Sequence, residues 1–430
     1  MQELIPRSSP ETSIPTIAVL GAGAAGLMAA IHAAGPARRV VLLERTTDGG
    51  RKILISGGGR CNVLPGTLDE ARFVTASSPN IMRKILRSWP LREQRQFFEQ
   101  TVGLPLVLEP ETGKLFPVAN RARVVRDALV ALARQRGVEW IGATEIVGLE
   151  STARRWQLTA VDGREFTADA VIITTGGLSV PATGSDGFGL RRLAELGHTV
   201  HDTYPALTPI TLDPPAYADL AGVSLDVVLT ATMPGAHRTT SGGFLFTHHG
   251  YSGPAVLDVS DIAVRSRLAG GEPARLRVQW TSLDATAWTE RLAPSAQTVV
   301  SALRPPLPGR LADRLLTMAS VDGATALAQL TRAARLRLIE LLVRFPLPWT
   351  GDEGYRKAEV TGGGVALDEV DPRTLESRLH RRLFLAGELL DAFGPIGGYN
   401  FVWAWSTGRL AGLGAAATLT RETRDEGRET

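Results

Sequence analysis

The pattern of apolar and small residues near the start of the chain predicts a strand, a glycine loop and a helix. A short apolar run, Ile17–Leu20, enters a G-x-G-x-x-G loop at Gly21–Gly26, and an alanine-rich run with helical character leaves it. A second apolar run, Val40–Leu43, follows and ends at Glu44. This order is the βαβ arrangement that opens a doubly wound parallel sheet.

The residue types in this unit suit a dinucleotide. Gly21 permits a tight turn, Gly23 lets backbone N–H groups approach a pyrophosphate, and Gly26 lets the helix pack close to the strand. Glu44 stands where an acid accepts hydrogen bonds from ribose hydroxyls. Small residues also pack helices against strands, so the loop alone leaves a structural role, NAD and FAD all open.

Further periodic runs extend an α/β pattern through the first half of the chain. An amphipathic helix is predicted over Asn120–Gly137, with Asn120 as its N-cap and its arginines on a solvated face. Strands are predicted over 138–143 and 146–149, and a hairpin at Trp156–Ala168 turns through Asp162-Gly163. Ala170–Gly177 is typical of a buried parallel strand that ends in glycines.

From about Pro205 short alternating runs replace this pattern, which indicates an inserted lobe. The final block predicts a glycine turn at Thr361–Ala366 and a buried strand ending at Glu388. Gly397-Gly398 then open a helix, whose N-terminal N–H groups suit an anionic ring edge or a phosphate. The predicted fold class is α/β: a Rossmann-like domain with an inserted β-barrel-like plus helical lobe. The predicted parts are a discontinuous domain at 15–205 and 355–420, a lobe at 206–354 (β-rich at 206–282, helical at 283–350), and flexible tails at 1–14 and 421–430.

Composition narrows the class of protein. Hydrophobic residues make up 44% and charged residues 21% of the 430 residues, as in ordinary globular proteins. A single cysteine, Cys61, excludes an internal disulfide and a flavin–disulfide relay. The polar N-terminus lacks the pattern of a signal peptide, and no apolar run reaches the ~18 residues of a membrane span. We therefore expect a cytoplasmic protein, and nothing in the sequence indicates a metal site.

A glycine-rich, cationic stretch at Asp48–Asn62 has two readings. It is either a flexible surface loop or a lid over a cofactor. Three consecutive glycines at Gly57–Gly59 carry an entropic cost that favours the lid, because they let backbone amides approach a flat ring or a phosphate.

The segment Gly50–Val63 resembles the signature of the HI0933-like (YhiN/BaiN-type) FAD-dependent flavoproteins. The resemblance continues at Thr112–Pro117, Leu245–Pro254 and Gly387–Asn400, so it covers almost the whole chain. It implies FAD as the ligand of the first βαβ unit and an NAD(P)H-linked oxidoreductase activity. Members of the family reduce C=C bonds, one on a bile-acid steroid and one on a uridine of ribosomal RNA.

The resemblance and the loop chemistry together predict a set of cofactor contacts along the chain. These are Gly21, Ala22, Gly23, Ala24, Ala25, Gly26, Glu44, Arg45, Arg51, Lys52, Ser56, Gly57, Gly59, Arg60, Val147, Thr175, Gly176, Gly177, Gly387, Glu388, Asp391, Gly397, Gly398, Tyr399, Asn400 and Phe401.

Reduction of a C=C bond needs a hydride and a proton donor. Cys61, His248 and Tyr399 are the predicted catalytic residues, with His249 and Tyr251 as further candidates. Arg60 beside Cys61 is expected to lower the pKa of the thiol. No second strand–G-x-G-x-x-G–helix unit is present, so NAD(P)H is expected to dock transiently at the flavin.

Two other functions stay open. An RNA-directed enzyme or binder would use basic clusters to contact phosphates, although charge runs are usually solvated faces. A flavoprotein that only senses redox state is the third reading. The basic clusters are Arg83, Arg87, Arg92 and Arg95, and Arg378, His380, Arg381 and Arg382.

Overall fold

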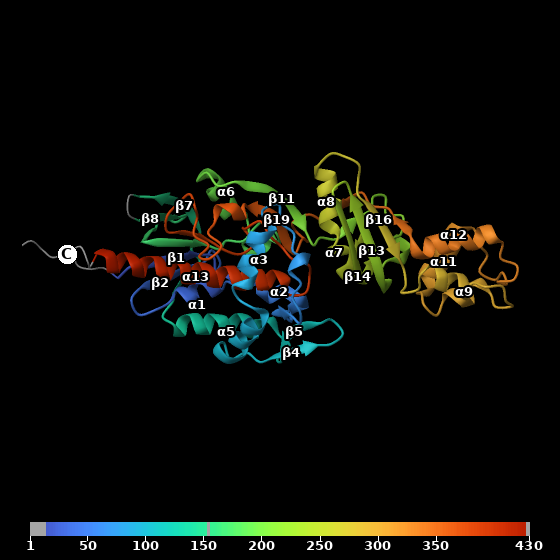
Figure 1. Ribbon diagram of the computed structural model, residues 1–430, viewed down its shortest axis with the longest axis horizontal. Helices are drawn as coiled ribbons and strands as arrows, with labels where there is room; N and C mark the ends of the chain where they lie inside the picture. Colours follow the sequence, from blue (N-terminus) through green and yellow to red (C-terminus); the bar gives the residue numbers. More distant parts are fainter. Residues whose placement is uncertain (1–13, 153–154, 427–430) are drawn as a thin grey trace, which may run out of the picture.

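The structure is a computed structural model that describes residues 14–152 and 155–426. The molecule is elongated, with an α/β domain at one end and an inserted lobe at the other (Figure 1). Of the tails predicted at 1–14 and 421–430, residues 1–13 and 427–430 lie outside the described residues. The last predicted helix, α13 (Tyr399–Glu426), continues through Arg421 into the stretch expected to be flexible.

A five-stranded sheet forms the centre of the α/β domain. Its order is β20-β10-β1-β2-β6, and every neighbouring pair is parallel. The strands are β1 (Thr16–Leu20), β2 (Arg39–Leu43), β6 (Glu139–Ile141), β10 (Ala170–Ile173) and β20 (Leu383–Leu385). The apolar runs of β1, β2, β10 and β20 are almost wholly buried, as expected of parallel strands covered on both faces.

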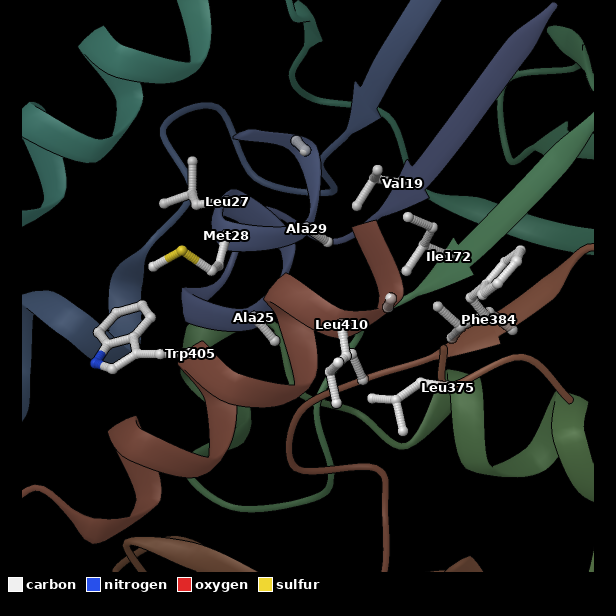
Figure 2. Packing of buried hydrophobic residues seen from close by; sticks show 14 of the residues in the cluster. Val19, Ala25, Leu27, Met28, Ala29, Ile172, Leu375, Phe384, Trp405 and Leu410 are labelled. Carbon is white, nitrogen blue, oxygen red and sulfur yellow. The ribbon is translucent and has the colours of Figure 1, made fainter. Parts of the chain in front are cut away.

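Helix α1 (Ala24–Ala33) packs along α13, and buried side chains of the two helices form the core beside the sheet (Figure 2). A Cβ added at Gly408 or Gly412 would lie 2.3 Å from the backbone oxygen of Ala25 or Ala29, respectively. The two glycines therefore let the helices touch backbone to backbone. Trp405 and Leu410 of α13 fill the space beside this contact.

Smaller elements surround this sheet. One antiparallel sheet joins β7 (Ile146–Ser151), β8 (Trp156–Ala160) and β9 (Glu165–Ala168), which confirms the predicted hairpin. The others in the domain are α2 (Arg51–Gly59), β3 (Leu64–Pro65), α3 (Pro79–Arg87), α4 (Leu91–Gln96), a π-helical turn (Phe97–Thr101), β4 (Leu106–Glu109), β5 (Lys114–Pro117), α5 (Ala122–Gln135) and α6 (Phe188–Glu195).

The inserted lobe is an antiparallel sheet capped by helices. The sheet order is β17-β16-β13-β14-β15-β12-β18, and α9, α11 and α12 lie at the far end of the molecule (Figure 1). Its elements are β12 (Ile210–Thr211), β13 (Ser224–Met233), β14 (Ala236–Phe246), β15 (Gly250–Ser252), α7 (Pro254–Leu257), α8 (Ser260–Leu268), β16 (Arg275–Gln279), α9 (Ala285–Arg291), α10 (Val299–Leu303), α11 (Gly309–Ala319), α12 (Arg332–Val343), β17 (Phe345–Leu347) and β18 (Gly351–Asp352).

Three local predictions are wrong. Thr361–Ala366 is not a turn: β19 (Val360–Val365) runs antiparallel to β11 (Val200–Ala206). Asn120 does not cap α5, because it adopts a left-handed conformation and Arg121 takes the cap position. Arg126 is not on a solvated face; it is buried and donates to the backbone oxygens of Asp48 and Gly49.

Candidate functional site

A cavity of about 410 Å³ opens at the carboxyl ends of the parallel strands. Leu20, Leu43, Thr174 and Gly387, which end or follow β1, β2, β10 and β20, all line it. Ligands of open α/β sheets bind at this edge, and the volume lies within the usual range of roughly 300–1,000 Å³ for ligand pockets.

The glycine loop forms one wall of the cavity. Gly21 has a φ of +96°, and a Cβ there would lie 2.9 Å from Thr174 O. A Cβ at Gly26 would lie 1.8 Å from Gly21 O, so only glycine lets α1 start this close to β1. A Cβ at Gly23 would meet no atom within 4 Å, because this position faces open space.

The N-terminus of α1 is left available for an anion. Its N-cap is Gly23, no side chain of the described chain caps it, and its first turn carries no acid. Ala24 and Ala25 of this turn line the cavity. Free N–H groups at a helix N-terminus suit a phosphate.

Glu44 is fixed by three hydrogen bonds. Its Oε2 accepts from Ala22 N at 2.6 Å, and its Oε1 accepts from the backbone N and the Oγ1 of Thr46 at 2.7 and 2.6 Å. The residue is 8% exposed and lines the cavity. The carboxylate is thus held in one orientation beside the loop, where an acid would meet a ribose.

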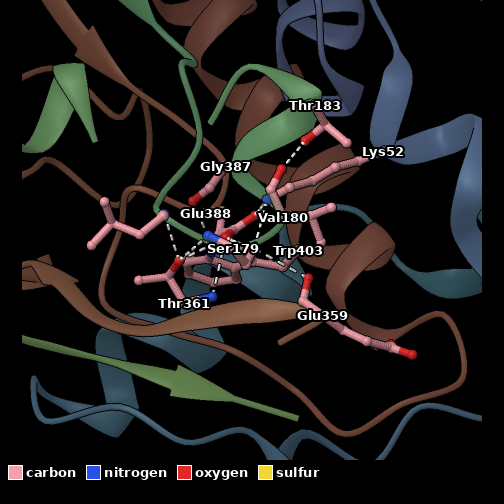
Figure 3. Close-up of polar contacts among 10 residues, drawn as sticks. Lys52, Ser179, Val180, Thr183, Glu359, Thr361, Gly387, Glu388 and Trp403 are labelled. Carbon is pink, nitrogen blue, oxygen red and sulfur yellow. Dashed lines mark hydrogen bonds and ion pairs between the residues drawn. The ribbon is translucent and has the colours of Figure 1, made fainter. Parts of the chain in front are cut away.

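A polar cluster joins four segments in the middle of the site (Figure 3). Lys52 Nζ donates to Ser179 Oγ at 2.6 Å and to Glu388 Oε2 at 2.5 Å. Glu388 Oε1 accepts from Ser179 Oγ and from the N and Oγ1 of Thr361. A Cβ at Gly177 would lie 2.4 Å from Thr361 Oγ1, so this glycine makes room for the cluster and does not line the cavity.

The start of α13 forms another wall. Gly397 and Gly398 both have positive φ, and a Cβ at Gly398 would lie 2.7 Å from the backbone carbon of Leu64. Asn400 holds the preceding turn by accepting from Gly394 N at 2.9 Å and donating to Gly394 O at 3.0 Å. Backbone amides of this turn therefore sit at the cavity in a fixed arrangement.

The inserted lobe touches this turn directly. Asp258, at the end of α7, accepts from Ile396 N at 2.8 Å and pairs with Arg72 at 3.2 Å. Burial raises the pKa of Asp258, against the opposing effects of the bond from Ile396 and of the nearby Arg72 and Arg238. The lobe thus makes a polar contact with the cavity wall through this carboxylate.

Many predicted cofactor residues meet at the cavity. Those that line it are Gly21, Gly23, Ala24, Ala25, Glu44, Arg45, Arg51, Lys52, Ser56, Gly57, Thr175, Gly176, Gly387, Glu388, Gly397, Gly398, Asn400 and Phe401. Those that do not are Ala22, Gly26, Gly59, Arg60, Val147, Gly177, Asp391 and Tyr399.

Two of the outlying residues have clear structural roles. Asp391 is buried, and its Oδ2 accepts from Thr75 Oγ1, Ala76 N and both the N and Oγ of Ser77. Arg60 pairs with Glu109 at 2.6 Å and lies over the ring of Phe116. Each side chain is engaged away from the cavity.

The expected activation of Cys61 is wrong. Its side chain is fully buried, and desolvation raises the pKa of the thiol to about 12, with a smaller opposing effect of the Ser56 hydrogen bond. The Arg60 guanidinium bonds Asn120 and Glu109 and does not lower this pKa. Cys61 is therefore a neutral packing residue.

The other proton-donor candidates also lie off the cavity. His248 and His249 are both exposed, in the turn between β14 and β15, so they do not alternate across a strand. Tyr251 is buried in the core of the lobe, where burial raises its pKa. The Tyr399 hydroxyl accepts from Asp69 N at 3.3 Å, and its ring packs on Phe73.

Sequence reasoning missed several residues of the cavity wall. Lys114 of β5 and Glu359 before β19 both face it, although they are far apart in the chain. Glu145, Asp186 and Phe393 line it as well. Lys114 falls within Thr112–Pro117 and Phe393 within Gly387–Asn400, two segments that carry the family resemblance. Glu145, Asp186 and Glu359 stand outside those segments.

A family model described as the HI0933-like protein Rossmann domain matches residues 15–414. The chain belongs to the HI0933-like family. This HI0933-like chain is 32% identical over 394 residues to the Escherichia coli K12 protein named ribosomal RNA dihydrouridine synthase, covering 90% of this chain and 95% of that one. It is also 32% identical over 411 residues to the 3-dehydro-bile acid delta(4,6)-reductase of Clostridium scindens, covering 93% and 98%.

Among solved structures, the HI0933-like chain is similar to 3-ketosteroid-delta4-(5alpha)-dehydrogenase from Rhodococcus jostii RHA1. The match has a TM-score of 0.47 at 16% identity and covers 96% of this chain and 100% of that one.

The HI0933-like protein is an FAD-dependent oxidoreductase. The residues present fit the cofactor, because Gly23 leaves open space, the α1 N-terminus carries neither cap nor acid, and Glu44 is held beside both. Within residues 14–152 and 155–426, no helix is long and apolar enough to cross a bilayer. The same residues contain no cluster of three or more His, Cys, Asp or Glu side chains suited to a metal ion.

Proposed function

We propose that the protein reduces a C=C bond of a small substrate at a bound flavin and takes its electrons from NAD(P)H. The observation that carries this proposal is a turn of the cavity wall that the inserted lobe holds from behind. The Ile396–Gly398 turn lines the cavity and is held by Asp258 of the inserted lobe. A substrate at this wall would contact a turn whose position the inserted lobe helps to fix. The bile-acid reductase named among the relatives supports a C=C substrate.

FAD would supply hydride transfer when bound. The α1 N-terminus and Glu44 would hold its pyrophosphate and ribose, as in other dinucleotide folds. The Gly397–Asn400 turn would direct backbone amides toward the ring, where they stabilise negative charge on the reduced form. Lys52 and Glu388 would keep the wall between these regions in place.

The electron donor is tested by anaerobic stopped-flow of the purified yellow protein with NADH and with NADPH. We expect one of them to bleach the flavin absorbance in a saturable phase, and a cyclic enone to restore it. Bleaching by neither nucleotide would remove NAD(P)H as the donor. Failure of every reductant to support turnover would favour the redox-sensing reading.

A ribosomal RNA base is the second candidate substrate, supported by the name of the Escherichia coli relative. The predicted basic clusters are partly engaged within the chain: Arg87 pairs with Glu70, Arg95 with Glu99, and His380 contacts Leu196 O. Binding to ribosomal RNA that weakens steeply with salt would support this candidate. An unchanged nucleoside composition of ribosomal RNA in a deletion strain would count against it.

A further inference from the structure

One acid and one cation on the cavity wall differ from all the others that line it. The acids there are Glu44, Glu145, Asp186, Glu359 and Glu388, and the cations are Arg45, Arg51, Lys52 and Lys114. In the described part of the chain, every one except Glu359 and Lys114 has a side-chain hydrogen bond or an ion pair.

Glu359 is held by its backbone and not by its carboxylate. Its N donates to Leu207 O at 3.1 Å, and its O accepts from Ser179 Oγ at 3.3 Å. The side chain extends away from the Lys52–Glu388 cluster, as Figure 3 shows, and is exposed to the cavity. The backbone of Glu359 is thus held in place, while its carboxyl group faces the cavity without a partner in the described chain.

Lys114 lies beside the turn at the start of α13. A Cβ at Gly397 would lie 3.0 Å from Lys114 Cε, so the stem of the side chain packs on this turn. Its ammonium is close enough to Glu359 to act on that carboxyl electrostatically, yet they form no ion pair within 4.0 Å.

Two opposite charges that face one cavity without pairing favour a polar ligand between them. Glu359 is exposed and Lys114 half-buried at the cavity, so both side chains are open to a ligand that can supply hydrogen-bond partners. Lys114 offers only donors, whereas a protonated Glu359 offers one O–H donor.

The protein around Glu359 favours its neutral form. Desolvation raises the pKa of its carboxyl, Asp258 raises it further, and Lys114 opposes both. A carboxyl with a raised pKa keeps its proton to a higher pH than a solvated carboxyl does, so it can donate that proton to a substrate.

We propose that Glu359 is the proton donor of this reductase and that Lys114 binds the carbonyl oxygen of an α,β-unsaturated carbonyl substrate. This inference rests on the proposed function, because it assigns the proton and the oxygen contact of that same reaction. It replaces Cys61, His248 and Tyr399, none of which reaches the cavity.

The proposed step balances as follows. Bound FAD would supply the hydride for a new C–H bond at the β-carbon, and the C=C electrons would move toward the carbonyl oxygen. Lys114 stabilises the resulting negative charge on that oxygen. The O–H bond of Glu359 then breaks, its proton forms a C–H bond at the α-carbon, and its electron pair remains on the carboxylate. Water in the cavity restores the proton.

The first test compares Glu359→Gln and Glu359→Asp with the wild-type holoenzyme. Glu353→Gln is the matched control, because Glu353 lies in the same segment and outside the cavity wall. Flavin content and melting temperature establish that each variant is folded.

We expect Glu359→Gln to slow reoxidation of the reduced flavin by cyclohexenone by roughly 10²–10⁴-fold, the usual contribution of a general acid. Reduction by NAD(P)H should stay unchanged, and Glu359→Asp should recover part of the rate. If the wild type reduces cyclohexenone and Glu359→Gln does so at the rate of Glu353→Gln, Glu359 is not the donor and the reductase function stands.

The second test does not depend on turnover. p-Hydroxybenzaldehyde presents a phenolate that mimics the negatively charged oxygen, and its binding perturbs the flavin spectrum. We expect Lys114→Met to weaken binding at least tenfold and Lys114→Arg to retain it. Glu359→Gln should tighten binding only at a pH high enough to ionise the Glu359 carboxyl, because only then is a negative charge removed.

The two tests distinguish failure of the Lys114–Glu359 site from failure of the proposed reductase function. Binding with this pattern in an enzyme that reduces no enone would support the Lys114–Glu359 site and remove the reductase function. Binding that ignores both residues would overturn the site, whatever the activity.

Discussion

Three glutamates on one cavity wall have different roles because their surroundings differ. Glu44 accepts three hydrogen bonds, and Glu388 pairs with Lys52 and three further donors. Glu359 has no such partner in the described chain, and burial raises its pKa. Residue type alone therefore does not assign a role; the number of donors around each carboxylate does.

Replacement of Glu44 should affect both the fold and the cofactor. In Glu44→Ala the buried N–H of Ala22 loses its acceptor, which costs about 1–3 kcal/mol of unfolding free energy. FAD retention should fall as well, because the acceptor for the ribose is removed. Urea unfolding and the flavin-to-protein ratio measure the two effects.

Glu44→Gln is the control for this prediction, since it keeps the shape and one acceptor oxygen. It should retain more flavin than Glu44→Ala. A purified Glu44→Ala protein with full flavin would show that Glu44 does not hold the cofactor.

At the scale of single residues, the sequence predicted the roles that depend on a local motif. Gly21–Gly26 and Glu44 were predictable because a tight turn and a ribose acid need fixed residue types at fixed spacing. Glu359 was not, because its role depends on β5 and α7, which only the fold brings near it. The prediction for Cys61 was wrong because the side chain of Arg60, its neighbour in the sequence, points away from the thiol.

At the scale of elements, α1 and α13 pack backbone to backbone. Gly408 and Gly412 stand four residues apart and face the backbone of α1. The N-termini of both helices open at the same cavity. A change in their separation would therefore move two walls of the site at once.

Gly408→Ala should separate these helices. The added methyl would lie 2.3 Å from Ala25 O and 3.0 Å from Met28 Cβ, so the backbone must shift. We expect a loss of about 1–3 kcal/mol in unfolding free energy and weaker FAD retention.

Gly309→Ala at the start of α11 is the matched control, because a Cβ there meets no atom within 4 Å. It should leave the protein as stable as the wild type or slightly more so. Equal effects of the two substitutions would show that the close contact is not responsible.

His32, near the end of α1, gives this element a pH dependence. Burial lowers the pKa of His32 to about 4, and Arg409 and Arg136 add to this effect, against the hydrogen bond with Met28 O. The unfolded chain therefore binds a proton that the folded chain does not. Stability should fall as pH drops from about 6.5 to about 4, by at most about 1.4 kcal/mol per pH unit.

His32→Phe keeps an aromatic ring between Trp89 and Phe97 and removes the titration. Its melting temperature should vary less with pH over this range than that of the wild type. The exposed His249→Asn should follow the wild type. A wild-type slope retained in His32→Phe would assign the dependence to other groups.

The type of an element, helix or strand, was predictable where the apolar periodicity was strong. Which strands pair with each other was not predictable. The buried runs of β1, β2 and β10 and the Asp162-Gly163 hairpin follow from the apolar pattern. Thr361–Ala366 contains three glycines and reads as a turn, yet it forms β19, because β11 and the backbone at Leu389 approach these glycines too closely for side chains. This close approach comes from the tertiary structure.

At the scale of the molecule, Asp258 is a polar link between lobe and cavity. Asp258→Ala removes the acceptor of Ile396 N and the partner of Arg72. We expect faster hydrogen–deuterium exchange in the peptide around Ile396–Gly398, because this turn loses its anchor. Exchange mass spectrometry measures it.

Asp226→Asn is the control for this prediction, since Asp226 is an exposed acid on β13 of the same lobe. Asp258→Asn should be intermediate, because its amide oxygen still accepts from Ile396. Unchanged exchange in Asp258→Ala would mean that the turn is held by Asn400 alone.

The two strands that connect the lobe to the rest of the molecule also pair with each other. β11 leads out and β19 returns beside it, so Leu207 and Glu359 are joined by a backbone hydrogen bond although 152 residues separate them. The lobe thus enters and leaves the α/β domain through one paired seam, and Glu359 stands at the point where the chain returns to that domain.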